Sequence, residues 1–220
     1  MAFKLDDTFI VLGRKQIGKS HLARRVQACF PRKVIFNTLR DSYRGPEFRR
    51  VETFAGFAHH LAEVHELREF QIVFDFFRYD LGDPRKEHWK ELNACLRALF
   101  ERGEAFDSPL LVVIEEAHNF CTPYQMPSWL TRCLREGAHA QLALLFTTQR
   151  PGGCHKDIIA AANHVFCGSL HDRSDLEYAR AVLHERSASL PMLPVREFYY
   201  FRPGVGTVLI DNDFRELGKR

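Results

Sequence analysis

Short apolar runs alternate along the chain with longer stretches whose apolar residues recur at helical spacing. The runs have the length of buried strands, and the longer stretches have the period of helices that pack one face on a sheet. Strands are therefore predicted at 8–13, 33–37, 71–77, 110–115, 141–147 and 164–168. Helices are predicted at 19–30, 53–67, 84–102, 127–138 and 174–184.

This alternation predicts an α/β fold with a mostly parallel central sheet flanked by helices. Strands such as LLVVI, residues 110–114, are apolar at every position, which is typical of strands covered on both faces. Two further strands at 197–201 and 207–210 are separated by the turn sequence PGVG and predict a small C-terminal hairpin at about 196–211. We expect residues 1–220 to form a single domain.

The segment GRKQIGKS, residues 13–20, matches the phosphate-binding loop pattern G-x-x-x-x-G-K-S between a predicted strand and a predicted helix. Glycines allow the backbone turns of such a loop, whose N–H groups converge on a phosphate at the start of the helix. Lys19 would reach the β- and γ-phosphates, and the Ser20 hydroxyl would bind Mg²⁺. The predicted nucleotide contacts are Gly13, Arg14, Lys15, Gln16, Ile17, Gly18, Lys19, Ser20 and His21.

Two carboxylates, Glu115 and Glu116, follow the strand LLVVI. Phosphoryl transfer to water needs one acid to hold the Mg²⁺ shell and one base to orient the attacking water. We expect Glu115 to serve the metal, through water, and Glu116 to polarise the nucleophile. Aspartate is the more common residue at the first of these positions. Because the Glu115 side chain is longer, the sequence does not define the geometry with which its carboxylate would reach the metal.

The sequence TTQRP, residues 147–151, ends the next predicted strand, 31 residues after Glu116. Carboxyl ends of parallel strands lie at the same edge of a sheet, where ligands bind. Gln149 is therefore expected to contact the γ-phosphate or the attacking water. Gln149 could report in this way whether the phosphate is still present. Arg150 could pass that signal to a neighbouring subunit or a DNA loop, and Pro151 ends the strand.

Three segments, GRKQIGKS, VVIEEAH and LREGAHAQLALLFTTQRP, together resemble the HerA/FtsK superfamily of motor ATPases. The short chain and the segment HDRSDLEYARAVL resemble the genome-packaging ATPases of icosahedral viruses with an internal membrane. The resemblance implies a RecA-like P-loop NTPase fold, ATP and Mg²⁺ as cofactors, and a homo-oligomeric ring, expected as a hexamer. The ring would translocate double-stranded DNA without sequence preference, and a virion vertex or portal protein would be a further partner.

The resemblance also implies an arginine that reaches the nucleotide of the neighbouring subunit. Superfamily members usually carry it eleven residues before the glutamine, and in this chain that position is Ala138. We expect Arg135, one turn earlier on the same predicted helix, to take the role, and Arg132 is the alternative. That both are helix-surface charges also stays open. Such an arginine changes turnover by about 10³–10⁵-fold in related enzymes.

Charge is unevenly distributed, since residues 1–50 carry a balance of +8 within a net charge of +3. A basic region of this kind is either a solvated face or the footprint of a phosphate-bearing partner, and part of it belongs to the predicted nucleotide site. The candidate DNA contacts are GGCHK, residues 152–156, with Lys156, and the basic loop 40–50, in which Tyr43 and Phe48 could face a partner. Contacts to phosphates would be salt-sensitive and independent of base sequence.

Several classes are disfavoured by what the sequence lacks. The longest purely apolar runs have five residues, against about 20 for a membrane span, and acidic residues interrupt the start. We therefore expect a cytoplasmic protein, in a host cell or associated with a virion. The six cysteines form no Cys-x-x-Cys pair, so no zinc site is expected. The Asn-Lys-x-Asp motif of GTPases and the Leu-Ser-Gly-Gly-Gln motif of ABC ATPases are absent. A P-loop kinase, a nucleotide-gated assembly factor and a plasmid or integrated-element DNA-transfer ATPase stay open as alternatives.

Overall fold

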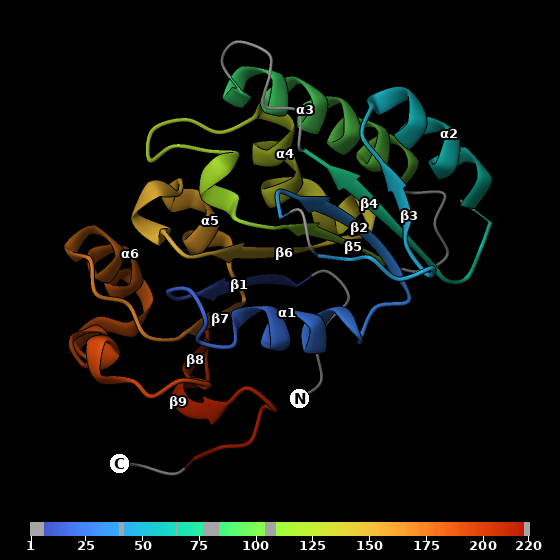
Figure 1. Ribbon diagram of the computed structural model, residues 1–220. Helices are drawn as coiled ribbons and strands as arrows, with labels where there is room; N and C mark the ends of the chain where they lie inside the picture. The colour runs from blue at the N-terminus through green and yellow to red at the C-terminus, as the bar shows by residue number, and fades with distance from the viewer. Residues whose placement is uncertain (1–6, 40–41, 65, 77–83, 104–108, 218–220) are drawn as a thin grey trace.

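A computed structural model describes residues 7–39, 42–64, 66–76, 84–103 and 109–217. These residues form a nine-stranded sheet in the order β3-β4-β2-β5-β6-β1-β7-β8-β9 (Figure 1). Strands β3 to β7 in this order run parallel, and β8 and β9 add an antiparallel hairpin at one edge. The strands are β1 (Thr8–Leu12), β2 (Arg32–Asn37), β3 (Arg49–Val51), β4 (Phe70–Asp75), β5 (Leu110–Ile114), β6 (Leu142–Thr148), β7 (His164–Cys167), β8 (Glu197–Arg202) and β9 (Gly206–Asp211).

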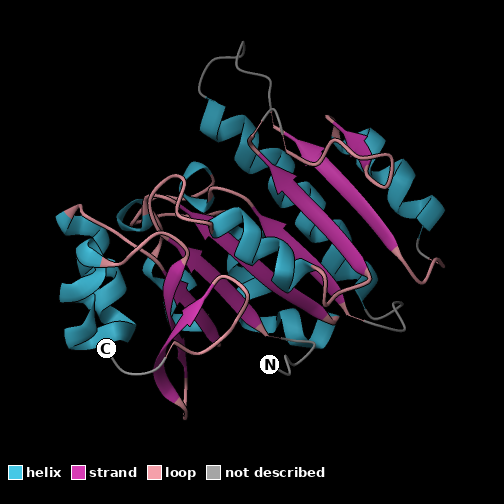
Figure 2. Cartoon of the chain, turned by 60° about the horizontal axis from the view of Figure 1, so that its bottom comes forward, coloured by secondary structure: helices cyan, strands magenta, loops and turns pink. Residues whose placement is uncertain are grey.

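Helices cover both faces of the sheet (Figures 1 and 2). Helix α1 (Lys19–Gln27) packs on one face, and the other described helices pack on the opposite face. These are α2 (Phe54–Val64), α3 (Pro84–Arg102), α4 (Ser128–Glu136), α5 (Lys156–Ala161) and α6 (Arg173–Leu183). Within β1, Phe9 and Val11 face α1 while Ile10 and Leu12 face the other layer, because successive strand residues point to opposite sides. The continuous apolar runs thus fill two cores.

The α/β class, the mostly parallel sheet and the C-terminal hairpin are confirmed, and each predicted strand and helix is present with ends shifted by a few residues. The strand β3, the helix α5 and the 3-10 helices, such as η5 (His184–Met192), were not predicted. The expected loop 40–50 ends in β3, which is the edge strand beside β4. Arg50 there binds the buried Asp75 carboxylate at 2.6 Å. None of the described helices is long and apolar enough to cross a lipid bilayer.

A buried polar network joins the C-terminal hairpin to the parallel part of the sheet. The His164 ring lies 2.7 Å from Asp7 Oδ2 through Nε2 and 2.7 Å from the Tyr200 hydroxyl through Nδ1. The Phe9 ring stacks on the imidazole at 4.8 Å, and the Tyr200 ring lies nearly parallel to it. Burial lowers the pKa of His164, so the neutral ring fits this geometry, donating to Asp7 and accepting from Tyr200. The hairpin is therefore fixed by hydrogen bonds as well as by its ladder with β7.

We expect Tyr200→Phe to lower the free energy of unfolding by about 1–3 kcal/mol, because it removes a hydrogen bond from a buried imidazole. The matched control is Tyr199→Phe, whose hydroxyl bonds Ser189 at the surface and should change stability by less than about 0.5 kcal/mol. Urea unfolding measures both. Equal midpoints for the two variants would contradict a stabilising role for this network.

Candidate nucleotide-binding site

Three segments of the predicted site leave the sheet at the carboxyl ends of β1, β5 and β6. These strands are adjacent in the order β5-β6-β1 and are all parallel. The predicted phosphate-binding loop, the acidic pair and the TTQRP segment therefore meet at one edge of the sheet. This is the edge at which open α/β sheets bind ligands.

The loop after β1 has the backbone of a phosphate-binding turn. Gly13 and Gly18 have φ values of 146° and 100°, which favour glycine. A Cβ atom on Gly13 would lie 2.1 Å from Ile17 Cδ1. The Gly13 N–H donates to the Thr148 carbonyl at 3.2 Å, which ties the loop to the end of β6. Because Gly18 is the N-cap of α1, the loop opens onto a helix N-terminus, where anions are stabilised.

Lys19 is buried on the inner side of this loop, with 8% of its surface exposed. Its Nζ donates to the Arg14 carbonyl at 2.8 Å. Burial lowers the pKa of Lys19, and the nearby Glu116 and Glu115 carboxylates oppose that shift. The loop thus holds one cation close to the acidic pair. Ile17 is buried, whereas five other predicted contacts are exposed: Arg14, Lys15, Gln16, Ser20 and His21.

Glu115 is buried at the end of β5, with 5% of its surface exposed. Its two oxygens accept hydroxyl hydrogen bonds at 2.5 Å, Oε1 from Tyr43 and Oε2 from Thr147. Burial raises the pKa of Glu115, and the Thr147 and Tyr43 hydroxyls act in the opposite direction. Tyr43, which the sequence suggested as a partner-facing aromatic, is instead buried here. That expectation was wrong because Tyr43 turns inward to meet this carboxylate.

Glu116 has a left-handed backbone with φ 51°, which is uncommon for a residue other than glycine. Its N–H donates to Thr147 Oγ1 at 3.2 Å, and its Oε2 accepts from the Gln149 N–H at 3.1 Å. The His118 Nδ1 atom lies 3.3 Å from the same oxygen. The Glu116 side chain is therefore directed to the end of β6 and held beside Gln149.

The two threonines at the end of β6 serve opposite faces of the sheet. Thr147 donates to Glu115, while Thr148 Oγ1 lies 2.9 Å from His118 Nδ1 and accepts from the Arg150 N–H at 3.0 Å. Gln149 is half-buried and Arg150 is exposed. Pro151 begins the 3-10 turn η4 (Pro151–Gly153), whose Gly152 N–H donates to the buried Asp175 of α6 at 2.8 Å.

The two candidate arginines of α4 differ in their contacts and in their exposure to solvent. Arg132 lies over the rings of Phe100 and Trp129, at 4.7 and 4.9 Å, and pairs with Glu136 at 2.9 Å. The Arg135 side chain is 72% exposed and only 3.9 Å from Asp157. Ala138 lies in the next turn, η3 (Gly137–Ala140). Of the two, Arg135 is the more available to a second subunit.

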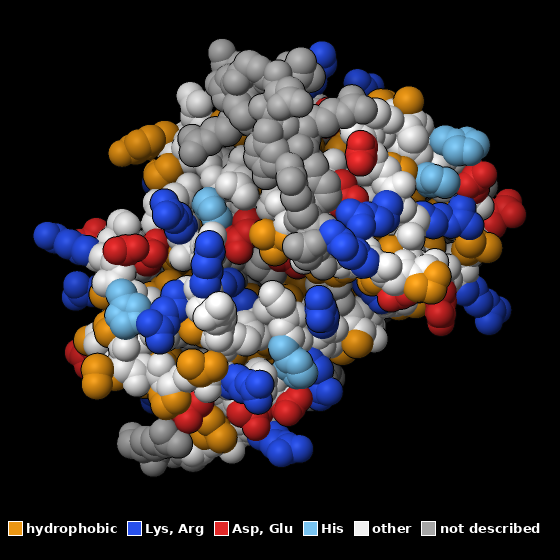
Figure 3. Space-filling model, in the orientation of Figure 1, with side chains coloured by type: hydrophobic (Ala, Val, Ile, Leu, Met, Phe, Trp, Pro, Cys, Tyr) orange, Lys and Arg blue, Asp and Glu red, His pale blue; other side chains and the backbone are white. Residues whose placement is uncertain are grey.

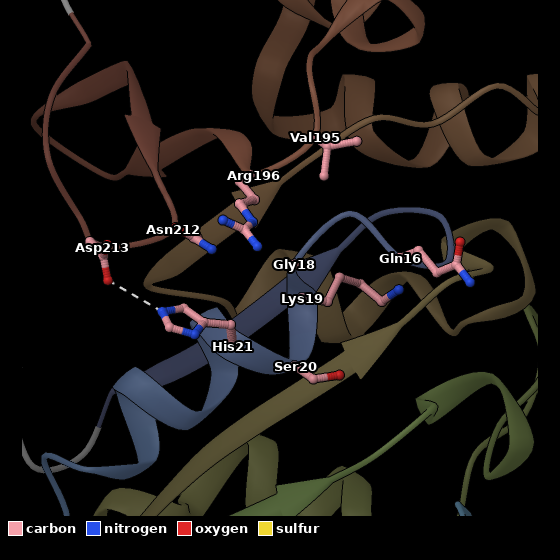
Figure 4. Close-up of a pocket in the computed structure, with 9 residues that line it drawn as sticks. All are labelled: Gln16, Gly18, Lys19, Ser20, His21, Val195, Arg196, Asn212 and Asp213. Carbon is pink, nitrogen blue, oxygen red and sulfur yellow. Dashed lines mark hydrogen bonds and ion pairs between the residues drawn. The ribbon is translucent and has the colours of Figure 1, made fainter.

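A hollow of about 470 Å³ lies beside the phosphate-binding loop (Figure 4). Residues between α6 and β8 and after β9 form one wall, and the Arg196 N–H donates to the Ile17 carbonyl at 3.0 Å. At one side of the hollow, His21 Nε2 lies 3.2 Å from Asp213 Oδ1. The sequence did not indicate this wall, because its only local signal is the Asn-Asp turn after β9. Its lining is Gln16, Gly18, Lys19, Ser20, His21, Val195, Arg196, Asn212 and Asp213.

The two candidate DNA segments are more ordered than expected. Residues 152–156 form the end of η4 and the start of α5, where Lys156 is exposed. In the part of 40–50 that is described, Phe48 packs edge-on to Tyr43 and Arg49 pairs with Glu63. Figure 3 shows the Lys and Arg side chains of one face in several groups with acidic side chains between them. Of the described residues, 49–50 thus belong to β3 and Lys156 to α5, while 42–48 contain no helix or strand.

The fold and the meeting of these segments define a RecA-like α/β fold with a phosphate-binding loop at its carboxyl edge. No protein-family model and no curated protein sequence matches the chain. Among solved structures, the genome packaging NTPase B204 from Sulfolobus turreted icosahedral virus 2, in complex with AMPPCP, is similar with TM-score 0.68 and 16% identity, covering 97% of this chain and 96% of that chain.

Two further structures are similar. VirB4 of Thermoanaerobacter pseudethanolicus has TM-score 0.68 and 10% identity, covering 96% of this chain and 91% of that chain. EccC of Thermomonospora curvata has TM-score 0.58 and 15% identity, covering 98% of this chain and 38% of that chain. These similarities show that the chain shares its fold with these three proteins.

We expect Gly13→Ala to abolish tight binding of a nonhydrolysable ATP analogue, because the new methyl group would collide with Ile17 and distort the loop. Gly204→Ala is the matched control, since Gly204 also has a positive φ, of 78°, but no atom lies within 4 Å of its added Cβ. Both variants should lose about 1 kcal/mol or more of stability from backbone strain. Calorimetric titration gives the affinities, and unchanged affinity in Gly13→Ala would contradict this loop geometry.

Proposed function

We propose that this protein is an ATP-hydrolysing translocase of double-stranded DNA, and specifically a viral genome-packaging motor. The fold it shares with packaging, secretion and transfer ATPases supports a translocating P-loop ATPase in general. The similarity to B204 extends over nearly the full length of both chains, which supports the packaging role. The observation that carries hydrolysis is the hydrogen bond between the Glu116 carboxylate and the Gln149 backbone, because it unites a base with a phosphate sensor.

In this proposal the segment from Gly13 to His21 holds the phosphates of ATP. Lys19 compensates their charge, and the hollow beneath Arg196 and Asn212 accommodates the nucleoside. Ser20 and Glu115 would hold Mg²⁺, and their chemistry fits the ion. Each Glu115 oxygen accepts one hydrogen bond from a hydroxyl and keeps a lone pair for a metal-bound water. The ion would neutralise phosphate charge when it is bound.

Glu116 orients the attacking water and accepts its proton, and Gln149 contacts the γ-phosphate or that water. The backbone of Gln149 is fixed to Glu116, so a change at the phosphate would move both residues together. Arg150 leaves the sheet next to them, and Gly152 is anchored on α6 through Asp175. Through this connection, a change at the phosphate could be transmitted to helix α6.

The protein would act as a homo-oligomeric ring, a hexamer in our proposal, in which Arg135 reaches the nucleotide of the neighbouring subunit. Lys156, at the exposed start of α5, would contact DNA phosphates. Such contacts carry no sequence information and weaken with salt. A virion vertex or portal protein would complete a packaging machine, whereas a plasmid or integrated element would use the same motor for DNA transfer.

We expect ATP turnover to rise with long double-stranded DNA and to lose that rise as salt increases, because DNA phosphates are the proposed contact. Glu116→Gln should keep nucleotide affinity and lower turnover by about 10²–10⁴-fold, the usual contribution of a general base. A phosphate-release assay across a salt series measures both. Turnover indifferent to DNA would favour a kinase-like or assembly role, and full turnover in Glu116→Gln would remove Glu116 from catalysis.

We expect Arg135→Ala to lower turnover by about 10³-fold or more, because the arginine would stabilise transferred charge. Arg173→Ala is the matched control, a 93% exposed arginine on α6 that pairs only with Glu177 in the ion pairs described. Mixing Arg135→Ala with Glu116→Gln subunits should restore turnover. In the mixed ring, some interfaces combine the intact Glu116 of one subunit with the intact Arg135 of its neighbour. No recovery on mixing would place the arginine elsewhere, and Arg132→Ala would be tested next.

A further inference from the structure

Tyr43 occupies an unusual place for a residue in a basic connection between two strands. It is 8% exposed and has a left-handed backbone with φ 59°. A bulky residue adopts this conformation rarely, and such strain persists where the surrounding structure fixes it. Its ring packs edge-on to Phe48 at 5.4 Å. The connection between β2 and β3 is therefore arranged to bring one phenol into the interior.

The direction of the hydrogen bonds at Tyr43 follows from chemistry. The Gln27 Nε2 atom donates to the Tyr43 hydroxyl at 3.0 Å, because an amide nitrogen has no lone pair to accept with. The phenol has a single proton, and it goes to Glu115 Oε1 at 2.5 Å. Gln27 is the last residue of α1, the helix that begins with Lys19 and Ser20. One helix thus carries the predicted phosphate contacts and the donor that orients Tyr43.

The second oxygen of Glu115 is fixed in the same manner from the opposite direction. Thr147 accepts from the Glu116 N–H at 3.2 Å and donates to Glu115 Oε2 at 2.5 Å. The carboxylate plane is thereby defined by two hydroxyls, one from the β2–β3 connection and one from β6. Removal of either hydroxyl would leave a flexible glutamate with one fixed oxygen and freedom to rotate.

We infer that Tyr43 is a positioning residue that orients Glu115 for the Mg²⁺–nucleotide complex. The inference rests on the proposed ATPase function and adds a residue outside its three sequence motifs. Glutamate has one more rotatable bond than the usual aspartate at this position, so its carboxylate needs an additional fixed contact. Tyr43 supplies that contact, and Gln27 holds Tyr43 in place.

The test is Tyr43→Phe, which keeps the buried ring and removes only the hydroxyl. ATP turnover would be measured against Mg²⁺ concentration, together with the affinity for ATP in EDTA. We expect kcat to fall roughly tenfold and the half-saturating Mg²⁺ concentration to rise by a similar factor, as for loss of a hydrogen bond to a charged group. Affinity in EDTA should stay at the wild-type value, since Tyr43 is not among the residues that line the hollow beside the phosphate-binding loop.

Tyr200→Phe is the control, because it also removes one buried hydroxyl but lies away from the site; its Mg²⁺ dependence should match the wild type. If Tyr43→Phe fails to fold, Gln27→Met tests the inference in its place. This variant should raise the half-saturating Mg²⁺ concentration by a smaller factor. Wild-type Mg²⁺ dependence and kcat in a folded Tyr43→Phe would overturn the inference while leaving the ATPase intact. A wild type without Mg²⁺-dependent turnover would overturn the proposed function itself.

Discussion

The buried carboxylate of Glu115 is the constraint around which the site is arranged. A carboxylate among apolar strands is unstable unless hydrogen bonds replace the water it has lost. Here the replacements are the hydroxyls of Tyr43 and Thr147, which come from different segments of the chain. Both segments must reach their positions for the two Glu115 oxygens to keep hydrogen-bond partners in the interior. The buried acid therefore links Tyr43 of the β2–β3 connection to Thr147 at the end of β6.

The same constraint extends from Glu115 to the groups around it. Thr147 also accepts the Glu116 N–H, which accompanies the left-handed turn of Glu116. That turn directs the Glu116 carboxylate to the Gln149 N–H. Gln149 in turn is next to Thr148, whose carbonyl accepts from Gly13 of the phosphate-binding loop. The acidic pair, the end of β6 and the loop thus form one hydrogen-bonded unit. A displacement of one of them should therefore displace the others.

Features of the molecule that local sequence specifies could be predicted, and features that depend on distant contacts could not. The sheet class followed from apolar runs, and the meeting of the loop, the acidic pair and TTQRP followed from the parallel order of the strands. Tyr43 could not be predicted, because its partner Glu115 is 72 residues away and the intervening pattern carries no sign of the contact. Arg196 and Asn212 were missed for the same reason. The three-residue β3 is too short to show a period.

The distribution of arginines bears on why a neighbouring subunit would be needed. Arg132 is held between two aromatic rings and an acid, so it would lose those contacts if it moved to a phosphate. Among the described ion pairs, that of Arg135, one turn away, is a long contact with Asp157, so this arginine can be redirected at small cost. Both lie on α4, while the phosphate-binding loop leads into α1 on the opposite face of the sheet. An exposed arginine on a helix that packs on the opposite face from α1 is suited to act on another subunit, which fits our proposal of turnover that depends on assembly.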